Sequence, residues 1–259
     1  MKNQFSLSRF SLLFKKHTIE HYKTYLMSLV VLVGVLGLVM GSSAYTEKEY
    51  PLNATKQYPF FFFFLFLAGS IFTSTIFSNL SDKKQATITL LLPASQFEKY
   101  LVGWVFSYVI FQVFYIAAFY LVDVLVVNMD EWGSRPKEIL NVFSPKPDHI
   151  VIFLGYALIH SFTMLGAIYF QKLHFVKTAF IFFVLCFLLI MLNQEVLELL
   201  IGRKLDMAIP FSQFSFHEGD TFHFVNAPLH MQKLVAILPL VLALIFWVTS
   251  YVRLTEKQI

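Results

Sequence analysis

The sequence predicts an all-α integral membrane protein with six transmembrane helices. Apolar residues make up 57% of the 259 residues and charged residues only 14%, which leaves too little polar surface to coat a water-soluble particle of this size. Six apolar blocks are each close to or above the roughly 20 residues that a helix needs to cross roughly 30 Å of hydrocarbon. They lie at residues 24–42, 58–80, 100–127, 150–170, 175–192 and 234–252.

The distribution of basic residues predicts that both termini lie in the cytoplasm. Six spans bring the two termini to one side of the membrane. The N-terminus, the second and fourth polar stretches and the C-terminal tail carry 12 of the 20 Lys and Arg residues, whereas the longer stretches on the other side carry 8. The positive-inside rule assigns the richer side to the cytoplasm. The outer loops are then residues 43–57, 128–149 and 193–233, and residues 1–259 form a single transmembrane domain.

Residues 1–23 precede the first span, and the pattern within residues 5–22 predicts an amphipathic helix. Such a basic helix lies in the cytoplasmic interface with its apolar face among acyl chains. A disordered basic tail is the alternative. The apolar face recurs at helical spacing through Leu7, Phe10, Leu13, Phe14 and His17.

The first two spans, within residues 24–80, carry three further patterns. Small residues at 42–44 offer a cleavage-like site, but the long charged start and the long apolar run favour an uncleaved anchor. Gly37 and Gly41 form a small-xxx-small step, which allows another helix to approach closely. The run of phenylalanines at 60–64 is bulky on all sides and predicts lipid-facing or interfacial surface.

Residues 81–99 form the most distinctive polar stretch. It begins charged, becomes apolar through residues 90–92, and continues with Pro93 followed by Ser95-x-x-Glu98. That order has the form of a capping box that opens a helix. It predicts a short helix across the cytoplasmic face before the third span, although an ordinary loop with a capped helix start accounts for the same residues.

Residues 91–100, LLPASQFEKY, resemble the sequence after the second span in the permease subunits of bacterial ABC-2 type exporters, also called type V exporters. The layout of the whole chain is similar too. In that family this position is a cytoplasmic coupling helix that docks into a groove of a separate ATPase, so the resemblance implies polar contacts from Glu98 and Lys99 and apolar contacts from Leu91, Leu92 and Phe97. The full set that it implies is Leu91, Leu92, Pro93, Ser95, Phe97, Glu98 and Lys99.

Three polar residues lie inside the spans of residues 100–192. Asp123 is a candidate functional acid near the outer end of the third span, or an acid at the wet interface. Gln112 and His160 are expected to form hydrogen bonds between helices.

The outer segment at 193–233, which precedes the last span and tail at 234–259, begins with an acidic and then apolar run that Gly202 stops. The run predicts a short helix that dips back into the membrane, and the resemblance implies re-entrant helices here. We expect Glu195 and Glu198 to face water and Leu200 to be buried in an outer gate.

Histidines are frequent in the same segment: His217, His223 and His230, with Glu218 and Asp220 nearby. Their spacing fits no zinc signature, so a solvated loop is expected and no metal site is predicted. The only cysteine, Cys186, excludes an internal disulfide.

The chain contains no GxxxxGK[ST], HExxH or GxSxG sequence. We therefore expect a non-enzymatic permease without catalytic or cofactor-binding residues, whose partner ATPase binds ATP and Mg²⁺. The expected partners are that cytoplasmic ABC ATPase, a second permease copy or a related permease, and membrane lipids, with no nucleic acid. The cargo is expected to be lipid-like or amphipathic, and the location is the bacterial cytoplasmic membrane. Two alternatives remain: a non-catalytic scaffold of a secretion or motility machine, and a membrane-embedded lipid-modifying enzyme that uses the three histidines.

Overall fold

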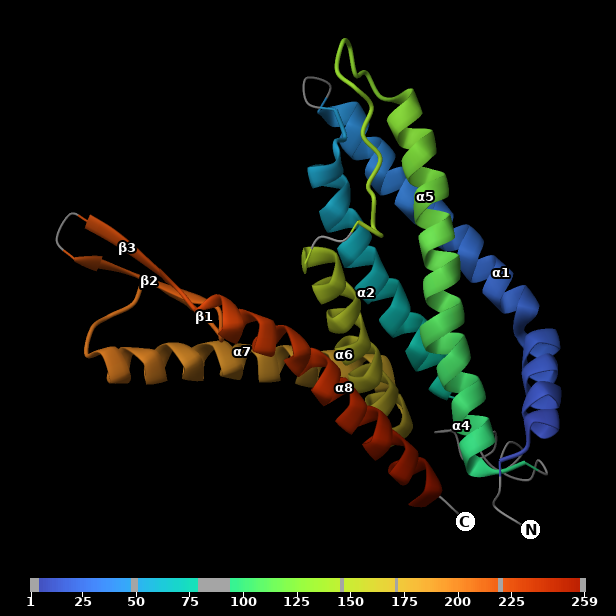
Figure 1. Cartoon of the computed structure of the whole chain (residues 1–259). Coiled ribbons are helices and arrows are strands. Elements are labelled where there is room, and N and C mark those ends of the chain that lie inside the picture. Colours follow the sequence, from blue (N-terminus) through green and yellow to red (C-terminus); the bar gives the residue numbers. More distant parts are fainter. Residues whose placement is uncertain are drawn as a thin grey trace.

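The structure, a computed structural model, describes residues 5–47, 51–78, 94–144, 147–170, 172–218 and 221–256. Six helical segments are long and apolar enough to cross a membrane, which confirms the six predicted spans. In order they are α1 (Leu7–Thr46), α2 (Ala54–Ser78), a rod made of α4 (Gln96–Trp104), η1 (Val105–Ile110) and α5 (Phe111–Met129), then α6 (Pro147–Tyr169), α7 (His174–Ile201) and α8 (Leu229–Glu256). The described chain begins and ends at one end of the molecule, beside the start of α4 (Figure 1).

The first helix is longer than predicted, because the expected interfacial helix and the first span form one α-helix of 40 residues. At 1.5 Å per residue it is about 60 Å long, twice the hydrocarbon thickness. The ribbon of α1 changes direction on its way toward the N-terminus, so that its first part runs beside the start of the rod (Figure 1). The N-terminal segment is therefore part of the helical body of the protein.

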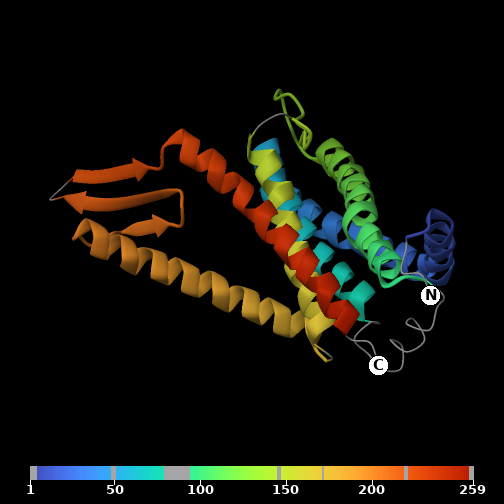
Figure 2. The same ribbon diagram turned by 60° about the horizontal axis from the view of Figure 1, so that its bottom comes forward.

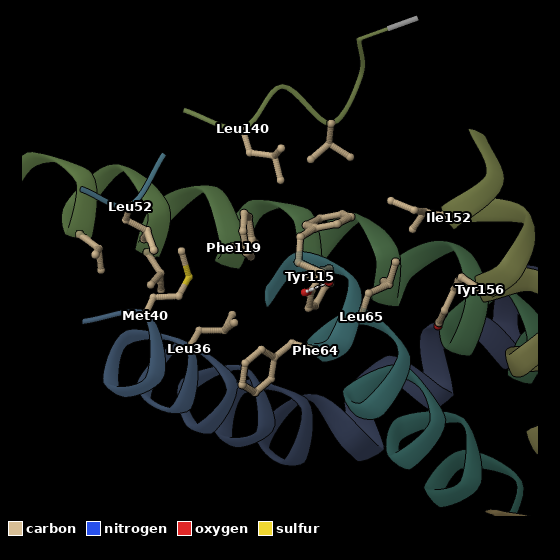
Figure 3. Close-up of a cluster of buried hydrophobic side chains, with 14 of the residues drawn as sticks. Leu36, Met40, Leu52, Phe64, Leu65, Tyr115, Phe119, Leu140, Ile152 and Tyr156 are labelled. Carbon is tan, nitrogen blue, oxygen red and sulfur yellow. Dashed lines mark hydrogen bonds between the residues drawn. The ribbon is translucent and has the colours of Figure 1, made fainter. Parts of the chain in front are cut away.

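We call α1, α2, the rod and α6 the bundle, and its core lies where these helices meet (Figure 3). Phe61 of α2 is fully buried, its ring stands edge-on to that of Phe119 at 5.0 Å, and its carbonyl accepts a hydrogen bond of 2.6 Å from the Tyr115 hydroxyl. Between helices in lipid, such close packing and hydrogen bonds supply the stability. The prediction that residues 60–64 are lipid-facing is thus wrong for Phe61, because α2 lies between α5 and α6, whereas Phe63 is 59% exposed.

Glycine allows close packing in the bundle, but at a position other than the predicted one. A Cβ atom at Gly69 would lie 2.4 Å from Cε2 of Tyr156, so the glycine makes room for this buried ring between α2 and α6. At Gly37 and Gly41 a Cβ would meet nothing within 4 Å. The expected close approach at that pair is not made within the described chain.

The chain then leaves the bundle in an arm, which we define as α7 and a three-stranded antiparallel sheet (Figure 2). The sheet consists of β1 (Met207–Ile209), β2 (Gln213–Glu218) and β3 (Thr221–Asn226) in the order β1-β2-β3. It joins the far end of α7 to α8, which returns along α6. Only 6% of the most apolar window of α7 is buried, against 50% for α6.

The arm corrects the prediction of short outer helices at 193–233. Nothing stops α7 before Gly202, which has a left-handed φ of 71°, so the run at 195–201 is the last part of α7 and not a separate re-entrant helix. In residues 213–218 and 221–226, phenylalanines alternate with polar residues, and a period of two is typical of a strand. The spans are helical as predicted, but the outer segment adds a sheet to the all-α fold.

Candidate functional site

The rod begins with the capping box that the sequence predicts. Ser95 has an extended backbone, and its hydroxyl accepts a hydrogen bond of 3.2 Å from the backbone N–H of Glu98. In return, Oε2 of Glu98 accepts one of 2.9 Å from the backbone N–H of Ser95. Two of the N–H groups that a helix start leaves without partners are thereby satisfied.

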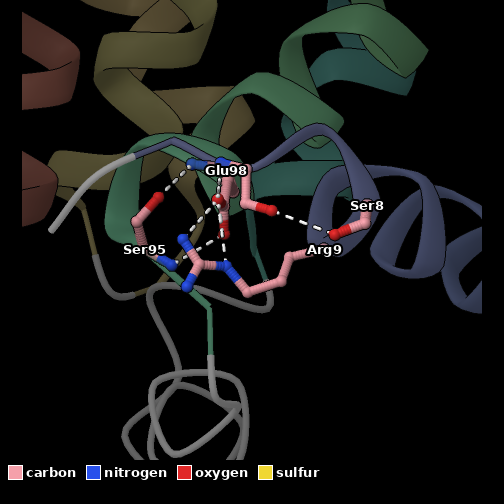
Figure 4. Close-up of polar contacts among 5 residues, drawn as sticks. Ser8, Arg9, Ser95 and Glu98 are labelled. Carbon is pink, nitrogen blue, oxygen red and sulfur yellow. Dashed lines mark hydrogen bonds and ion pairs between the residues drawn. The ribbon is translucent and has the colours of Figure 1, made fainter. Parts of the chain in front are cut away.

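The carboxylate of Glu98 also binds the beginning of the chain (Figure 4). Its Oε1 accepts two hydrogen bonds, one of 2.7 Å from the backbone N–H of Ser6 and one of 2.9 Å from Nη2 of Arg9. Glu98 is fully buried, while the Arg9 side chain keeps 39% of its exposure. Hydrogen bonds to an ionised group are about twice as strong as neutral ones. We call this arrangement of Ser6, Arg9, Ser95 and Glu98 the Glu98 clamp; it fastens the start of α1 to the start of the rod.

The clamp changes the expected roles at this end. Glu98, predicted to face an ATPase, directs both carboxylate oxygens to groups of its own chain, and Lys99 is only 8% exposed. Phe97 keeps the predicted outward position, since it is 41% exposed and its ring stands edge-on to those of Phe5 and Tyr251 at 6.1 and 5.7 Å. The predicted contacts Leu91, Leu92 and Pro93 lie outside the described residues.

The predicted apolar face of the N-terminal helix contacts protein over part of its length. The rings of Phe14 and His17 lie 4.7 and 4.5 Å from that of Phe106 in η1. Leu7, predicted to lie on the same face, is 72% exposed. One face of the helix is therefore held against the rod through Phe14 and His17, while Leu7, Leu12 and Ile19 are exposed and can contact lipid or a partner.

A chain of hydrogen bonds joins the rod, α6 and α8. Nε1 of Trp247 donates to Nδ1 of His160 over 3.1 Å, so in the neutral imidazole the proton lies on Nε2. Nε2 then donates to Oγ of Ser107, 2.8 Å away in the π-helix η1. The Tyr100 hydroxyl adds a second link, because it donates to the carbonyl of Trp247 over 2.8 Å. His160 thus makes the predicted interhelical bonds, and π-helical turns are frequent at functional sites.

The other two intramembrane candidates have different surroundings. Gln112 donates to the carbonyl of Tyr108 in its own helix over 2.9 Å, so the expected bond between helices is absent from the described chain. Asp123 is fully buried, not at a wet interface. Its carboxylate faces the backbone of Leu140, but neither oxygen makes a hydrogen bond of standard geometry within the described residues.

The three residues expected at an outer gate lie in the last turns of α7. Glu195 is exposed as predicted. Glu198 is half-buried, and its Oε1 accepts from the backbone N–H of Leu205 over 3.1 Å, which holds the turn after the helix. Among the described residues, Val196, Leu199 and Leu200 are 51%, 84% and 75% exposed, so the predicted burial of this apolar run is not made there.

The histidines of the outer segment are not arranged as a metal site. Phe216 pairs with His223 and His217 with Phe222 across β2 and β3, so the two histidines lie on opposite faces of the sheet. Nδ1 of His217 lies 2.7 Å from a carboxylate oxygen of Asp206 at the surface. Over the ranges that the structure describes, no group of three metal-ligating side chains was found; the side chain of His230 lies outside them.

The sequence matches no protein-family model, no curated protein and no solved structure. A function for this chain is therefore inferred from its geometry and its sequence pattern. Sequence reasoning identified Ser95, Glu98 and His160, but it missed Ser6, Arg9 and Trp247. Ser6 directly precedes the first helical turns, a typical position for a cap, yet no local pattern links it to a residue 92 positions away.

Proposed function

We propose that this chain is the permease subunit of an ABC-2 type transporter in a bacterial cytoplasmic membrane. A separate ATPase drives it from the cytoplasmic side, where both termini lie, and a second permease copy completes the path for a lipid-like or amphipathic cargo. This chain contributes no covalent chemistry. The resemblance of residues 91–100 to the coupling segment of that family is the starting point of the proposal.

The Glu98 clamp is the observation that supports the proposal most. The second half of the resembling segment opens the rod at the same end of the molecule as the two termini. Phe97 and Leu7 are exposed there, at 41% and 72%. A partner that binds this end thus finds apolar side chains on an element that is rigidly attached to the N-terminal helix through Arg9 and Ser6.

The contacts inside the bundle supply a path for mechanical coupling. A force on the start of α4 acts on α1 through the Glu98 clamp and on α8 through the hydrogen bond from Tyr100 to Trp247. The link from Ser107 through His160 draws α6 into the same movement. Movement of the rod then alters how α6 and α8 lie beside it, which is the type of change that opens a path between two permeases.

The arm has an exposed apolar face that a second copy could cover. Along α7, large apolar side chains such as Phe183 and Leu192 are 69% and 62% exposed, and one chain covers little of the helix. Such an apolar face can be covered either by lipid or by the corresponding surface of another permease.

The test compares two exposed phenylalanines at opposite ends of the bundle. The tagged chain is purified from its native membrane, and co-purifying subunits are identified by mass spectrometry and assayed for ATP hydrolysis. We expect a Walker-motif ATPase to co-purify. Phe97→Ala should weaken its retention about tenfold, because truncating an apolar anchor costs more than about 1 kcal/mol. Phe143→Ala should leave its retention unchanged. Phe143 is 70% exposed in the loop before α6. Elution from size exclusion verifies that both variants are folded.

Each alternative gives a different result. Co-purification with a secretion or motility assembly that hydrolyses no nucleotide supports the scaffold. Equal losses with Phe97→Ala and Phe143→Ala remove the start of α4 from the interface. The experiment also tests the orientation, because a cytoplasmic ATPase binds only the end that faces the cytoplasm.

A further inference from the structure

A hollow of about 440 Å³ lies between α6, α7 and α8, near the end that carries the termini. Its volume is within the roughly 300–1,000 Å³ of small-molecule sites. The buried Gly166 and Thr178 lie where α6 and α7 are closest, since a Cβ at Gly166 would lie 1.9 Å from Oγ1 of Thr178. Its lining is mostly apolar and includes Tyr169, Phe170, Thr178, Ile181, Thr249 and Arg253.

The walls select an apolar occupant. Apart from Tyr169 and Arg253, the polar side chains of the lining are two threonines. Both threonine hydroxyls already donate within their own helices: Thr178 to the carbonyl of His174 over 2.6 Å and Thr249 to that of Ile245 over 2.8 Å. Their methyl groups are left to contact an occupant. A polar molecule would find few partners along these walls.

The rim selects a negative charge. The guanidinium of Arg253 lies 5.3 Å from the ring centre of Tyr169, and Nζ of Lys177 lies 5.6 Å from that of Phe170. Nη1 of Arg253 donates to Glu256, but its Nε is buried and makes no hydrogen bond within the described residues. Two cations over the neighbouring rings of Tyr169 and Phe170 form a suitable place for a phosphate.

We propose that this hollow binds an anionic phospholipid, with one acyl chain between α6, α7 and α8 and the phosphate at Arg253 and Lys177. The position fits a lipid, because the apolar walls belong to spans and the cations lie at the span ends, as headgroup-binding residues do. Ile181 of α7 and Thr249 of α8 are exposed, so the hollow opens toward the outer surface of these two helices. The inference is independent of the proposed transport function.

The test measures lipid retention by native mass spectrometry of the purified full chain, titrated separately with phosphatidylglycerol, phosphatidylcholine and inorganic phosphate. We expect one retained phosphatidylglycerol per chain, at least tenfold weaker retention of phosphatidylcholine, and no retained phosphate. Arg253→Gln should weaken phosphatidylglycerol retention about tenfold. Arg203→Gln is the matched control, because Arg203 is an exposed arginine in the arm; it should leave retention unchanged.

A variant that fills the hollow tests whether an acyl chain binds there, independently of the charges at the rim. Ile181→Trp occupies the hollow from an exposed position of α7 and should abolish the single retained lipid, even if Arg253→Gln does not fold. Equal retention of the two lipids, equal losses with Arg253→Gln and Arg203→Gln, or full retention with Ile181→Trp would each overturn the proposal. Retained inorganic phosphate that competes with the lipid would replace it by a simple anion site.

Discussion

The bundle and the arm each contain an Arg–Glu ion pair of 2.9 Å, but the two pairs have different surroundings. In the bundle, Arg9 binds a Glu98 that is fully buried and accepts two further backbone N–H groups. In the arm, Arg203 binds Glu218, and both side chains are about half exposed. Exposed pairs contribute about 0–1 kcal/mol, whereas breaking a buried one leaves groups that water cannot reach. Two ion pairs of equal length are therefore expected to contribute unequally to the stability of the protein.

The same contrast extends to the helices themselves. About half of the apolar window of α6 is buried against other helices, but almost none of that of α7 is. In the bundle, α2, the rod and α6 are thus held by contacts within one chain, with 39–50% of their apolar windows buried, whereas α1 has only 11% buried. The arm depends on what surrounds it, and substitutions in the two regions should differ accordingly.

The largest difference is expected when the acid of each pair is removed. Glu98→Ala leaves the N–H groups of Ser6 and Ser95 without acceptors, at about 1–3 kcal/mol each, so we expect a loss of about 3 kcal/mol in the free energy of unfolding. Glu218→Ala, the matched variant, should lose at most about 1 kcal/mol. Denaturation of the purified chain in mixed detergent micelles measures both.

The comparison between the clamp and the surface pair fails if the two variants lose equal stability. A second readout is limited proteolysis near the N-terminus. Cleavage within residues 5–22 should accelerate only in Glu98→Ala, because only that change releases Ser6 and Arg9 from the rod.

A smaller effect is expected from added methyl groups within the bundle. Gly69→Ala places a Cβ 2.4 Å from the ring of the buried Tyr156, and such overpacking costs about 1–3 kcal/mol. Gly41→Ala adds the same group where nothing lies within 4 Å. It should be neutral or, because alanine favours helix over glycine by up to about 1 kcal/mol, slightly stabilising.

The melting temperatures of the two alanine variants test this ordering. A lower value for Gly41→Ala than for Gly69→Ala would mean that another chain covers α1 at Gly41. Such a result would restore the predicted close approach of Gly37 and Gly41, but between copies of the protein instead of within one.

Local signals account for the parts of the structure that the sequence predicted. Hydropathy identifies the six spans because each is a continuous apolar run, and Ser95 and Glu98 are three residues apart, within one capping motif. The partners of Glu98 were not predictable in this way, since Arg9 lies 89 positions earlier in the chain. For His160 the polarity of the side chain indicated an interhelical bond, but no pattern identified Trp247 as the donor.

The outer segment was mispredicted because two signals competed. The acidic and apolar run at 195–201 does form helix, but as the end of α7. Its helical pattern favours helix for the whole outer segment, whereas the alternation in residues 213–218 favours a strand. The period of two was present in Phe214 and Phe216, which alternate with Ser215 and His217. In the bundle, the phenylalanines at 60–64 have no periodicity at all, so sequence alone could not indicate that Phe61 and Phe64 are the buried ones.

The smallest effect is expected at the histidines of the arm. His217 and His223 lie on opposite faces of the sheet, and their polar partners are exposed. His217 lies 2.7 Å from Asp206, while His223 lies 3.1 Å from the Thr221 hydroxyl and 3.8 Å from Glu218. Replacing both by Ala should change the melting temperature by no more than about 4 °C, since the exposed contacts together contribute about 1 kcal/mol or less and 1 kcal/mol corresponds to about 2–4 °C. ATP hydrolysis by the complex should be unchanged. Stoichiometric zinc in the purified protein, lost in the double variant together with activity, would contradict this. It would mean that the two histidines meet ligands from elsewhere, and it would favour the lipid-modifying enzyme over the permease.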